Sequence, residues 1–150
     1  MTTKAAINDF LAQQKIAVVG VSRNSKKFGN IVYKDLRKKG YQTFAINPSA
    51  TTVDGEPCYP DLHSLPQPVD AMVVVVPPAE TEKIVRQAAE VGIRHVWMQQ
   101  GAESEQAIRL CKENNINVIH GQCILMFSEP TGFMHRLHRW VWSVLGKLPN

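Results

Sequence analysis

Apolar positions along the chain follow two patterns that predict strands and helices in turn. Short unbroken runs of β-branched residues predict buried strands, and the clearest is 71–76 (AMVVVV). Segments with apolar residues three or four positions apart predict amphipathic helices. The predicted strands are 16–20, 41–46, 71–76, 95–98 and 117–120, and the predicted helices are 28–39, Pro77-Pro78 to Val91, and 103–114. This alternation predicts an α/β fold: a single Rossmann-like, doubly wound and mostly parallel sheet with helices on both faces.

Two segments depart from this alternation. Residues 49–68 are rich in turn-forming residues and leave room for one short helix near Leu62. Residues 133–148 carry apolar side chains at helical spacing and predict a C-terminal amphipathic helix. We expect that helix to pack on the domain, with a homodimer contact or a membrane surface as alternatives. Residues 1–125 are therefore predicted to form the Rossmann-like domain, and 126–150 its helical extension.

The stretch 16–30 (IAVVGVSRNSKKFGN) predicts an anion site. It places a strand ending at Gly20 before a basic, serine-rich turn and a helix with Gly29 in its first turns. Unpaired N–H groups and a partial positive charge at a helix N-terminus favour phosphate. The turn lacks the GxGxxG fingerprint, because Ser22 and Ser25 stand where the second and third glycines would be.

The net charge of +4 is concentrated beside that turn. Seven basic residues and one acidic residue, Asp35, lie between Arg23 and Lys39, which favours a polyanionic ligand. Arg23, Lys26 and Lys27 lie in the turn itself and are the ligand candidates. The helical cations are expected to form a solvated face; they are Lys34, Arg37, Lys38 and Lys39. The aromatic residues do not alternate with the basic residues of this stretch, which makes nucleic acid a weaker candidate.

Composition fits a cytoplasmic protein of one domain. The 150 residues hold no apolar run of about 18 residues, so no membrane span is expected, and no signal peptide is recognised. The three cysteines show no metal-ligand spacing and suit reduced thiols. We predict neither a metal site nor a self-contained catalytic constellation, since Ser-His-Asp, HExxH and Walker patterns are absent. His120 is expected to be structural, and His135 and His138 have no third ligand.

The loop after the second strand bears on the choice of nucleotide. Ligands of doubly wound sheets bind outside the carboxyl ends of the strands, where an NAD enzyme places an acidic residue for the ribose. This chain has Asn47-Pro48 at that place, so a strong part of dinucleotide recognition is missing.

Six segments in order resemble a known family. GVSRNSKKFG, AINP, GEPCYPDL, DAMVVVVPP, VWMQQGA and GQC occur in the order seen in the coenzyme A-binding domain. That domain is related to the N-terminal part of the succinyl-CoA synthetase alpha subunit and also occurs as small stand-alone proteins. The resemblance covers about residues 15–125 and implies a Rossmann-like fold with coenzyme A over the strand ends.

The resemblance also implies roles for individual residues. Ser22, Arg23, Ser25 and Lys26 would hold the phosphates, helped by N–H groups near Phe28 and Gly29. Asn47-Pro48 and Val76-Pro77 would flank the adenosine, and Gln99, Gln100 and Gly101 would lie toward the pantetheine arm. Cys123, beyond the last strand, could form a mixed disulfide with the coenzyme thiol. The predicted cofactor-binding residues are Gly20, Ser22, Arg23, Ser25, Lys26, Phe28, Gly29, Asn47, Pro48, Val76, Pro77, Gln99, Gln100, Gly101 and Cys123.

The sequence thus favours a small coenzyme A-binding protein, a carrier, sensor or accessory module without chemistry of its own. Two alternatives stay open. One is a partner-dependent component of an acyl-CoA synthetase, and the other is an NAD(H)-binding, redox-sensing module.

Overall fold

The computed structural model describes residues 2–24 and 26–127. Ser25 and the predicted C-terminal helix at 133–148, with His135, His138 and the proposed dimer contact, lie outside the described residues. The division of the chain at residue 125 therefore stays a prediction.

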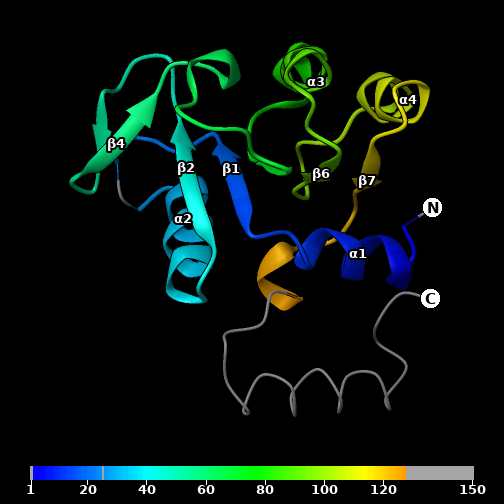
Figure 1. Ribbon diagram of the computed structural model, residues 1–150, viewed down its shortest axis with the longest axis horizontal. Helices are drawn as coiled ribbons and strands as arrows, with labels where there is room; N and C mark the ends of the chain where they lie inside the picture. The colour runs from blue at the N-terminus through cyan, green and yellow to red at the C-terminus, as the bar shows by residue number, and fades with distance from the viewer. Residues whose placement is uncertain (1, 25, 128–150) are drawn as a thin grey trace.

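One mostly parallel sheet organises the described part of the chain (Figure 1). Its seven strands lie in the order β3-β4-β2-β1-β5-β6-β7, and every neighbouring pair is parallel except β3 with β4. The strands are β1 (Lys15–Val19), β2 (Gln42–Ile46), β3 (Thr52–Val53), β4 (Glu56–Tyr59), β5 (Ala71–Val74), β6 (His95–Met98) and β7 (Asn117–Ile119). The predicted doubly wound sheet is confirmed.

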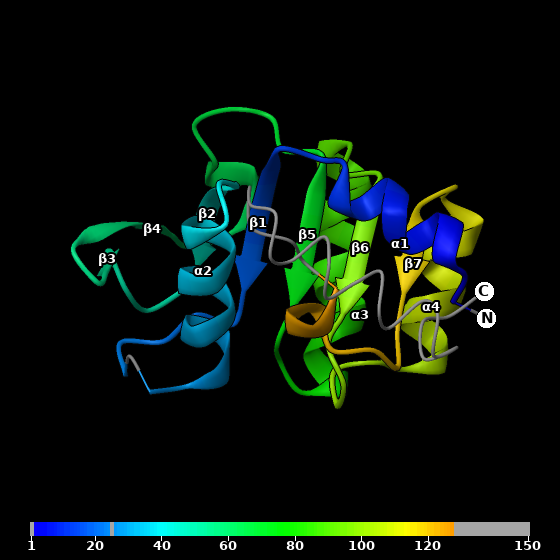
Figure 2. The ribbon, with the colours of Figure 1, turned by 90° about the horizontal axis from the view of Figure 1, so that it is seen from below.

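Helices cover both faces of this sheet. Figures 1 and 2 show α1, α2 and η2 on one face and α3 and α4 on the other. The helices are α1 (Lys4–Leu11), α2 (Phe28–Lys38), α3 (Pro78–Val91) and α4 (Glu105–Glu113), with 3-10 turns η1 (Leu62–Ser64) and η2 (Ile124–Met126). The predicted helices on both faces, and the short helix near Leu62, are confirmed.

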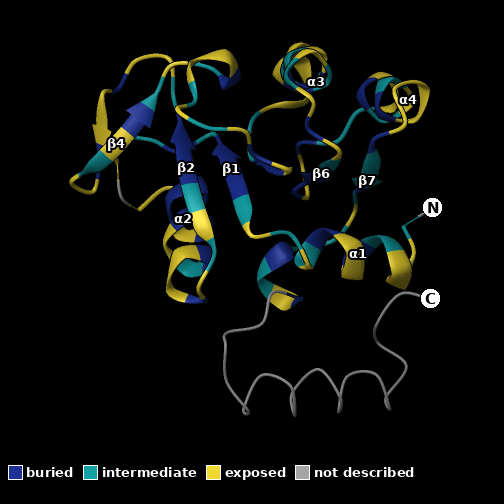
Figure 3. Ribbon diagram, in the orientation of Figure 1, coloured by how far each residue is buried: buried dark blue, intermediate teal, exposed yellow. Residues whose placement is uncertain are grey.

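Successive side chains of a strand point to opposite faces of the sheet, so each strand contributes to two separate core layers. Ile16 and Val18 of β1 pack in the layer beneath α1 and α2, whereas Ala17 and Val19 pack in the layer beneath α3 and α4. The strands are accordingly buried along much of their length, and the outer sides of the helices are exposed (Figure 3). Burial on both faces explains why the strands read as unbroken apolar runs.

The order of the strands creates a crevice between β1 and β5. The chain moves from β1 to β2 on one side, and then crosses to β5 on the other side of β1. Gly20 directly follows β1 with φ +113°, and a Cβ there would lie 2.2 Å from the carbonyl oxygen of Val75. Only glycine permits this approach, so the two strand ends meet closely at the point where α/β proteins bind their ligands.

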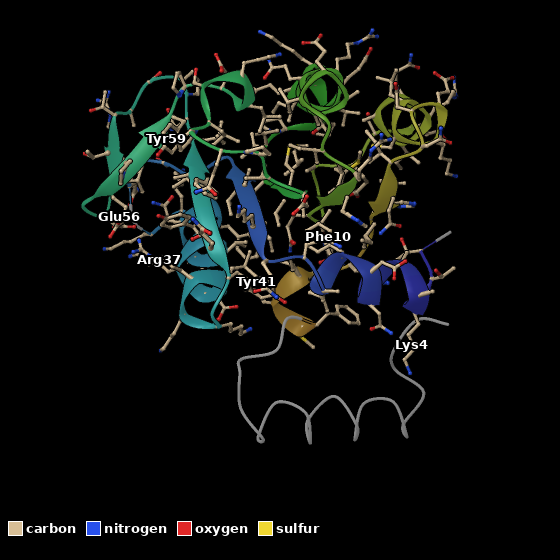
Figure 4. All side chains as sticks on the ribbon, viewed as in Figure 1. Lys4, Phe10, Arg37, Tyr41, Glu56 and Tyr59 are labelled. Atoms are coloured by element: carbon tan, nitrogen blue, oxygen red, sulfur yellow. The ribbon has the colours of Figure 1, made fainter. Side chains whose placement is uncertain are left out.

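Helix α1 is an element that the sequence analysis missed. Thr3 caps it by accepting a hydrogen bond from the Ala6 N–H at 3.1 Å, and Ile7 and Phe10 are buried. Phe10, labelled in Figure 4, meets Trp97 of β6 edge-on, and the two ring centroids are 5.3 Å apart. The spacing of Ile7 and Phe10 on one helical face was the signal available in the sequence.

The β3–β4 hairpin is a second correction, because residues 49–68 were expected to hold turns and one short helix. Val53 pairs with Glu56, so Asp54 and Gly55 form a two-residue turn. Both have positive φ, +52° and +79°, which is the conformation that an Asp-Gly hairpin turn requires.

The basic face of α2 is only partly as predicted. Lys39 is 8% exposed and its Nζ lies 2.7 Å from Asp35 Oδ2, so it is not part of a solvated face. Lys38 is exposed. Two further exposed cations reach the hairpin: Lys34 lies 3.6 Å from Asp54, and Arg37 lies 2.9 Å from Glu56 (Figure 4).

Candidate functional site

A cavity of about 660 Å³ lies at the carboxyl ends of β1, β2, β4 and β5, and we call it the main cavity. The loops that follow these strands form most of its wall, and one side of α3 completes it. The lining residues are Val19, Gly20, Val21, Ser22, Ile46, Asn47, Pro48, Ser49, Pro60, Asp61, Leu62, Val75, Val76, Pro77, Glu80, Lys83, Ile84 and Gln87. The structure thus brings together six of the predicted site residues: Gly20, Ser22, Asn47, Pro48, Val76 and Pro77.

A buried asparagine fixes the lip of this cavity. The Asn30 side chain is fully buried in α2; its Oδ1 accepts from the Ser22 N–H and its Nδ2 donates to the Ser22 carbonyl, both at 2.7 Å. The amide therefore satisfies both backbone groups of Ser22. Sequence reasoning missed Asn30, because nothing in the pattern shows that its side chain points back at the preceding loop.

Asn47 restrains the same loop from the other side. Its Nδ2 donates to the Val21 carbonyl at 2.6 Å, and its Oδ1 accepts from the Ser49 N–H at 2.7 Å. Its backbone N–H donates to the Tyr59 carbonyl at 2.9 Å. The Asn47 side chain thus shapes the wall of the cavity with polar atoms that are already engaged by the protein.

The N-terminus of α2 begins beyond this loop and holds unengaged donors. No side-chain hydrogen bond caps it at Lys27, and no described residue accepts from the N–H groups of Phe28 and Gly29. A Cβ on Gly29 would lie 2.3 Å from the Gly20 carbonyl oxygen, so glycine is required for the helix to approach the strand end. Lys26 and Lys27 are exposed beside these N–H groups. This arrangement provides partial positive charge for an anion.

Arg23 lies in a smaller cavity of about 350 Å³, which we call the side pocket. Its lining residues are Arg23, Ser49, Thr51, Thr52, Val53 and Asp54. The Arg23 guanidinium donates to the Ser49 carbonyl oxygen. Ser49 lines both cavities, so the side pocket adjoins the main cavity.

The predicted residues after β6 do not line the main cavity. Gln99 is 3% exposed, and its Oε1 accepts from the Ile124 N–H at 3.1 Å. Gln100 Nε2 donates to the Gly121 carbonyl at 3.3 Å. These contacts tie the end of β6 to the segment after β7.

Gly101 and Cys123 complete that region. The Gly101 N–H donates to the Glu103 carboxylate at 3.1 Å. The Cys123 thiol is half-buried immediately before η2.

The lining of the main cavity combines aliphatic and charged side chains. Ile46, Leu62 and Ile84 contribute aliphatic surface, whereas Asp61 and Lys83 contribute charge. Hydrogen bonds from Ser64 lower the pKa of Asp61, because its carboxylate accepts from the Ser64 N–H at 2.9 Å and the hydroxyl at 2.8 Å. Aliphatic surface beside a few polar groups is typical of a small-molecule site.

Among the described residues, no three His, Cys, Asp or Glu side chains gather to hold a metal ion. His120 has its backbone N–H bound to Thr2 Oγ1 at 3.2 Å, and burial lowers its pKa. No helix in the described part of the chain is both long and apolar enough to span a membrane.

The fold and cavity define an α/β domain of the Rossmann-like class, with a ligand-sized cavity at its topological switch point. Residues 14–129 match the family model described as CoA binding domain, and the chain belongs to this family.

Three relatives illustrate the range of the similarity. The chain is 28% identical over 123 residues to the uncharacterized protein YneT of Bacillus subtilis, covering 81% of this chain and 91% of YneT. It is 25% identical over 123 residues to acetate–CoA ligase (ADP-forming) I of Archaeoglobus fulgidus, covering 75% of this chain but only 18% of the ligase. A solved structure, a conserved hypothetical protein from Pyrococcus furiosus, is 39% identical with a TM-score of 0.71, covering 75% of this chain and 97% of that one.

Proposed function

We propose that this protein binds coenzyme A across the carboxyl ends of β1, β2 and β5. The observation that carries the proposal is the main cavity at the switch point. The start of α2, which has no side-chain cap, approaches this cavity at Gly29, because Gly29 packs against the carbonyl of the lining residue Gly20. Membership of the CoA binding domain family supports coenzyme A as the ligand.

The main cavity suits the adenosine part of the coenzyme. Its volume of about 660 Å³ lies within the range of small-molecule sites, roughly 300–1,000 Å³. Pro48 and Val76-Pro77 line it from two different strand ends, and Ile46 and Leu62 add aliphatic surface. An adenine ring between these groups would bury its faces against apolar side chains.

The phosphates of the coenzyme would bind at the start of α2. The N–H groups of Phe28 and Gly29 and the ammonium group of Lys26 supply donors and positive charge there. Ser22 adds a hydroxyl whose oxygen already accepts from the Asn24 N–H at 3.1 Å, which leaves its O–H to donate. The Ser22 N–H is not a phosphate donor in this proposal, because Asn30 occupies it.

The pantetheine arm would then extend from the phosphates toward Gln100, Gly101 and Cys123. In this proposal Gln99 supports the site from beneath, since its side-chain oxygen binds the Ile124 N–H. The covalent option is thiol–disulfide exchange: the Cys123 thiolate would attack the disulfide of oxidised coenzyme A, forming a mixed disulfide and releasing one coenzyme A as its thiol. Mass spectrometry after incubation with oxidised coenzyme A tests this directly, and the absence of a reducible adduct on Cys123 would exclude it.

The physiological role that fits this site is that of a cytoplasmic carrier, sensor or accessory module. A second role, a partner-dependent component of an acyl-CoA synthetase, is favoured by the similarity to the Archaeoglobus ligase. The two roles separate in an assay for acyl-CoA formation with and without added synthetase subunits. Activity that appears only in the mixture supports the second role.

Titration calorimetry tests the binding itself. We expect coenzyme A to bind more tightly than NADH, with an affinity that falls as salt screens its phosphates. Lys26→Gln should weaken binding about tenfold, in the range of a charge-assisted contact.

The matched control is Lys38→Gln, which removes an exposed positive charge from the far end of α2 and should leave the affinity nearly unchanged. The absence of any coenzyme A binding would refute the proposal, and tighter binding of NADH would favour the redox-sensing alternative.

A further inference from the structure

A third cavity, of about 510 Å³, lies beside the amino-terminal half of β2, and we call it the edge pocket. In the described part of the chain it shares no lining residue with the main cavity or the side pocket. Four aromatic side chains line it, Tyr33, Tyr41, Phe44 and Tyr59, and two of them, Tyr41 and Tyr59, are labelled in Figure 4. The edge pocket is therefore separate from the site proposed for the coenzyme.

The edge pocket forms because β4 pairs with only part of β2. Strand β1 pairs with all five residues of β2, whereas β4 pairs only with Ala45 and Ile46. The next donor of β4 along this ladder would be the N–H of Pro57, which proline lacks. One side of β2 is therefore open over residues 42–44.

Thr43 directs both of its backbone groups into this opening. In a parallel ladder, successive residues of a strand bond alternately to the neighbours on its two sides. The Gln42 N–H donates to the Gln14 carbonyl at 2.9 Å, and the Ile46 carbonyl accepts from the Gly20 N–H at 3.4 Å, so even-numbered residues of β2 face β1. Thr43 therefore faces the edge pocket, and no described residue forms a hydrogen bond with its N–H or its carbonyl.

The charged side chains of the edge pocket neutralise each other. Arg37 Nη2 of α2 lies 2.9 Å from Glu56 Oε1 of β4, and Figure 4 shows the two side chains next to each other. The guanidinium also donates to Tyr33 Oη at 3.3 Å. The lining as described holds no further charged side chain, so the pocket favours an uncharged ligand.

These features define the chemistry of a ligand. Aromatic side chains suit a planar ring, and an N–H beside a carbonyl pairs with an acceptor beside a donor. The opening of three residues is short for an added peptide strand, since strands usually have about five or six residues. We propose that the edge pocket binds an uncharged nucleobase, whose neighbouring acceptor and donor pair with the backbone of Thr43.

Uridine and adenosine test this proposal, each beside a counterpart that is methylated at its donor. 3-Methyluridine lacks the N3–H of uridine, and N6,N6-dimethyladenosine lacks the amino hydrogens of adenosine, but neither carries a charge. Proton–nitrogen NMR titrations should show at least one parent nucleoside shifting the Thr43 amide resonance. Its methylated counterpart should bind about tenfold more weakly, because the Thr43 carbonyl then has no donor. The tighter parent identifies the base as a pyrimidine or a purine.

The same titrations are repeated with excess coenzyme A, which separates the edge pocket from the main cavity. The nucleoside affinity at Thr43 should not change, because the two sites share no lining residue. Binding of neither nucleoside at Thr43, equal affinity for the methylated counterpart, or displacement by coenzyme A would each overturn the nucleobase site. None of these results bears on whether coenzyme A itself binds, so the proposed function is tested separately.

Two variants test the pocket itself. Thr43→Pro removes the N–H, at a position where no strand partner needs it, and should weaken the nucleoside about tenfold. Tyr59→Leu keeps an apolar side chain but removes a ring whose centroid lies 6.4 Å from that of Phe44, and should weaken it about fivefold. The amide spectrum reports whether each variant is folded. If Thr43→Pro does not fold, Tyr59→Leu decides, and unchanged affinity in a folded variant would contradict the site.

Discussion

Replacing Asn30 by alanine should destabilise the protein more than its single, short side chain suggests. The amide makes two hydrogen bonds of 2.7 Å to Ser22, and the residue is fully buried. Each bond contributes about 1 kcal/mol, and each Ser22 group left without a partner adds a desolvation penalty of roughly 1–3 kcal/mol where water cannot reach it. Ser22 is half-buried, so water compensates in part, and the expected loss is about 3 kcal/mol.

Urea and thermal unfolding measure this loss. For a chain of this length, 1 kcal/mol shifts Tm by roughly 2–4 °C, so Asn30→Ala should lower Tm by about 6–12 °C. The urea midpoint should fall without a change in the m-value, because the fold and its buried surface are retained. The affinity for coenzyme A should fall too, since the lip of the main cavity loses its support.

The control for this variant is Asn114→Ala. Asn114 Nδ2 also donates to a backbone carbonyl, that of Leu110 at 2.8 Å, but it does so on the exposed surface, where water replaces the bond. We expect a change within about 0.5 kcal/mol. If Asn30→Ala proves no more destabilising than this control, the claim that a buried amide holds the loop is wrong.

Three further predictions concern other parts of the chain. Gly29→Ala should lower the free energy of unfolding measured in urea by about 3 kcal/mol, because its Cβ would lie 2.3 Å from the Gly20 carbonyl oxygen. Gly92→Ala, with φ +84° but open space around it, should lower it by only about 1 kcal/mol, and similar losses for the two variants would contradict the close approach at Gly29. Burial lowers the pKa of His95 below its ordinary 6.5, so the unfolded chain binds protons more readily and the free energy of unfolding should fall as the pH drops below about 6.5. His95→Gln should reduce that fall, and an unchanged dependence of stability on pH would exclude His95 as its cause. A thiol reagent at pH 8 should modify the half-buried Cys123 first and leave Cys111 unmodified in the folded protein, because burial raises the pKa of Cys111 to about 12. Mass spectrometry measures the order of modification, and the reverse order would refute this prediction.

The sheet was predictable because its central strands are buried on both faces. The run AMVVVV at 71–76 contains no polar residue, which is typical of a strand buried on both faces. Strand β5 (Ala71–Val74) lies within this run. Glycines marked the helix ends equally well: Gly92, with φ +84°, is the C-cap of α3 as its place after Val91 predicts. An unbroken apolar run and a glycine after a helix are both local features, so they can be recognised in a single sequence.

The hairpin was missed for a physical reason. Strands of two and four residues carry too few apolar positions to show alternation, and Pro57 in β4 is unfavourable in a strand interior. The Asp54-Gly55 pair was the available signal.

The candidate site was predictable by segment but not by contact. The sequence placed the loops after β1, β2 and β5 at one edge of the sheet, and the main cavity lies there. The sequence does not indicate that the Asn47 side chain donates to the Val21 carbonyl, or that the Gln99 side chain accepts from the Ile124 N–H. Such roles arise from pairs 25 or 26 residues apart, which depend on the assembled fold.

The hydrogen bonds of Asn30 and Asn47 to residues 21 and 22 bear on the rate at which a ligand associates. Asn30 holds Ser22 from the helix side, and Asn47 holds Val21 from the strand side. A segment restrained in this way has already lost conformational entropy during folding, so ligand binding orders it little further. Stopped-flow traces at increasing ligand concentration should then show one phase whose rate rises linearly, without the plateau of a slow rearrangement.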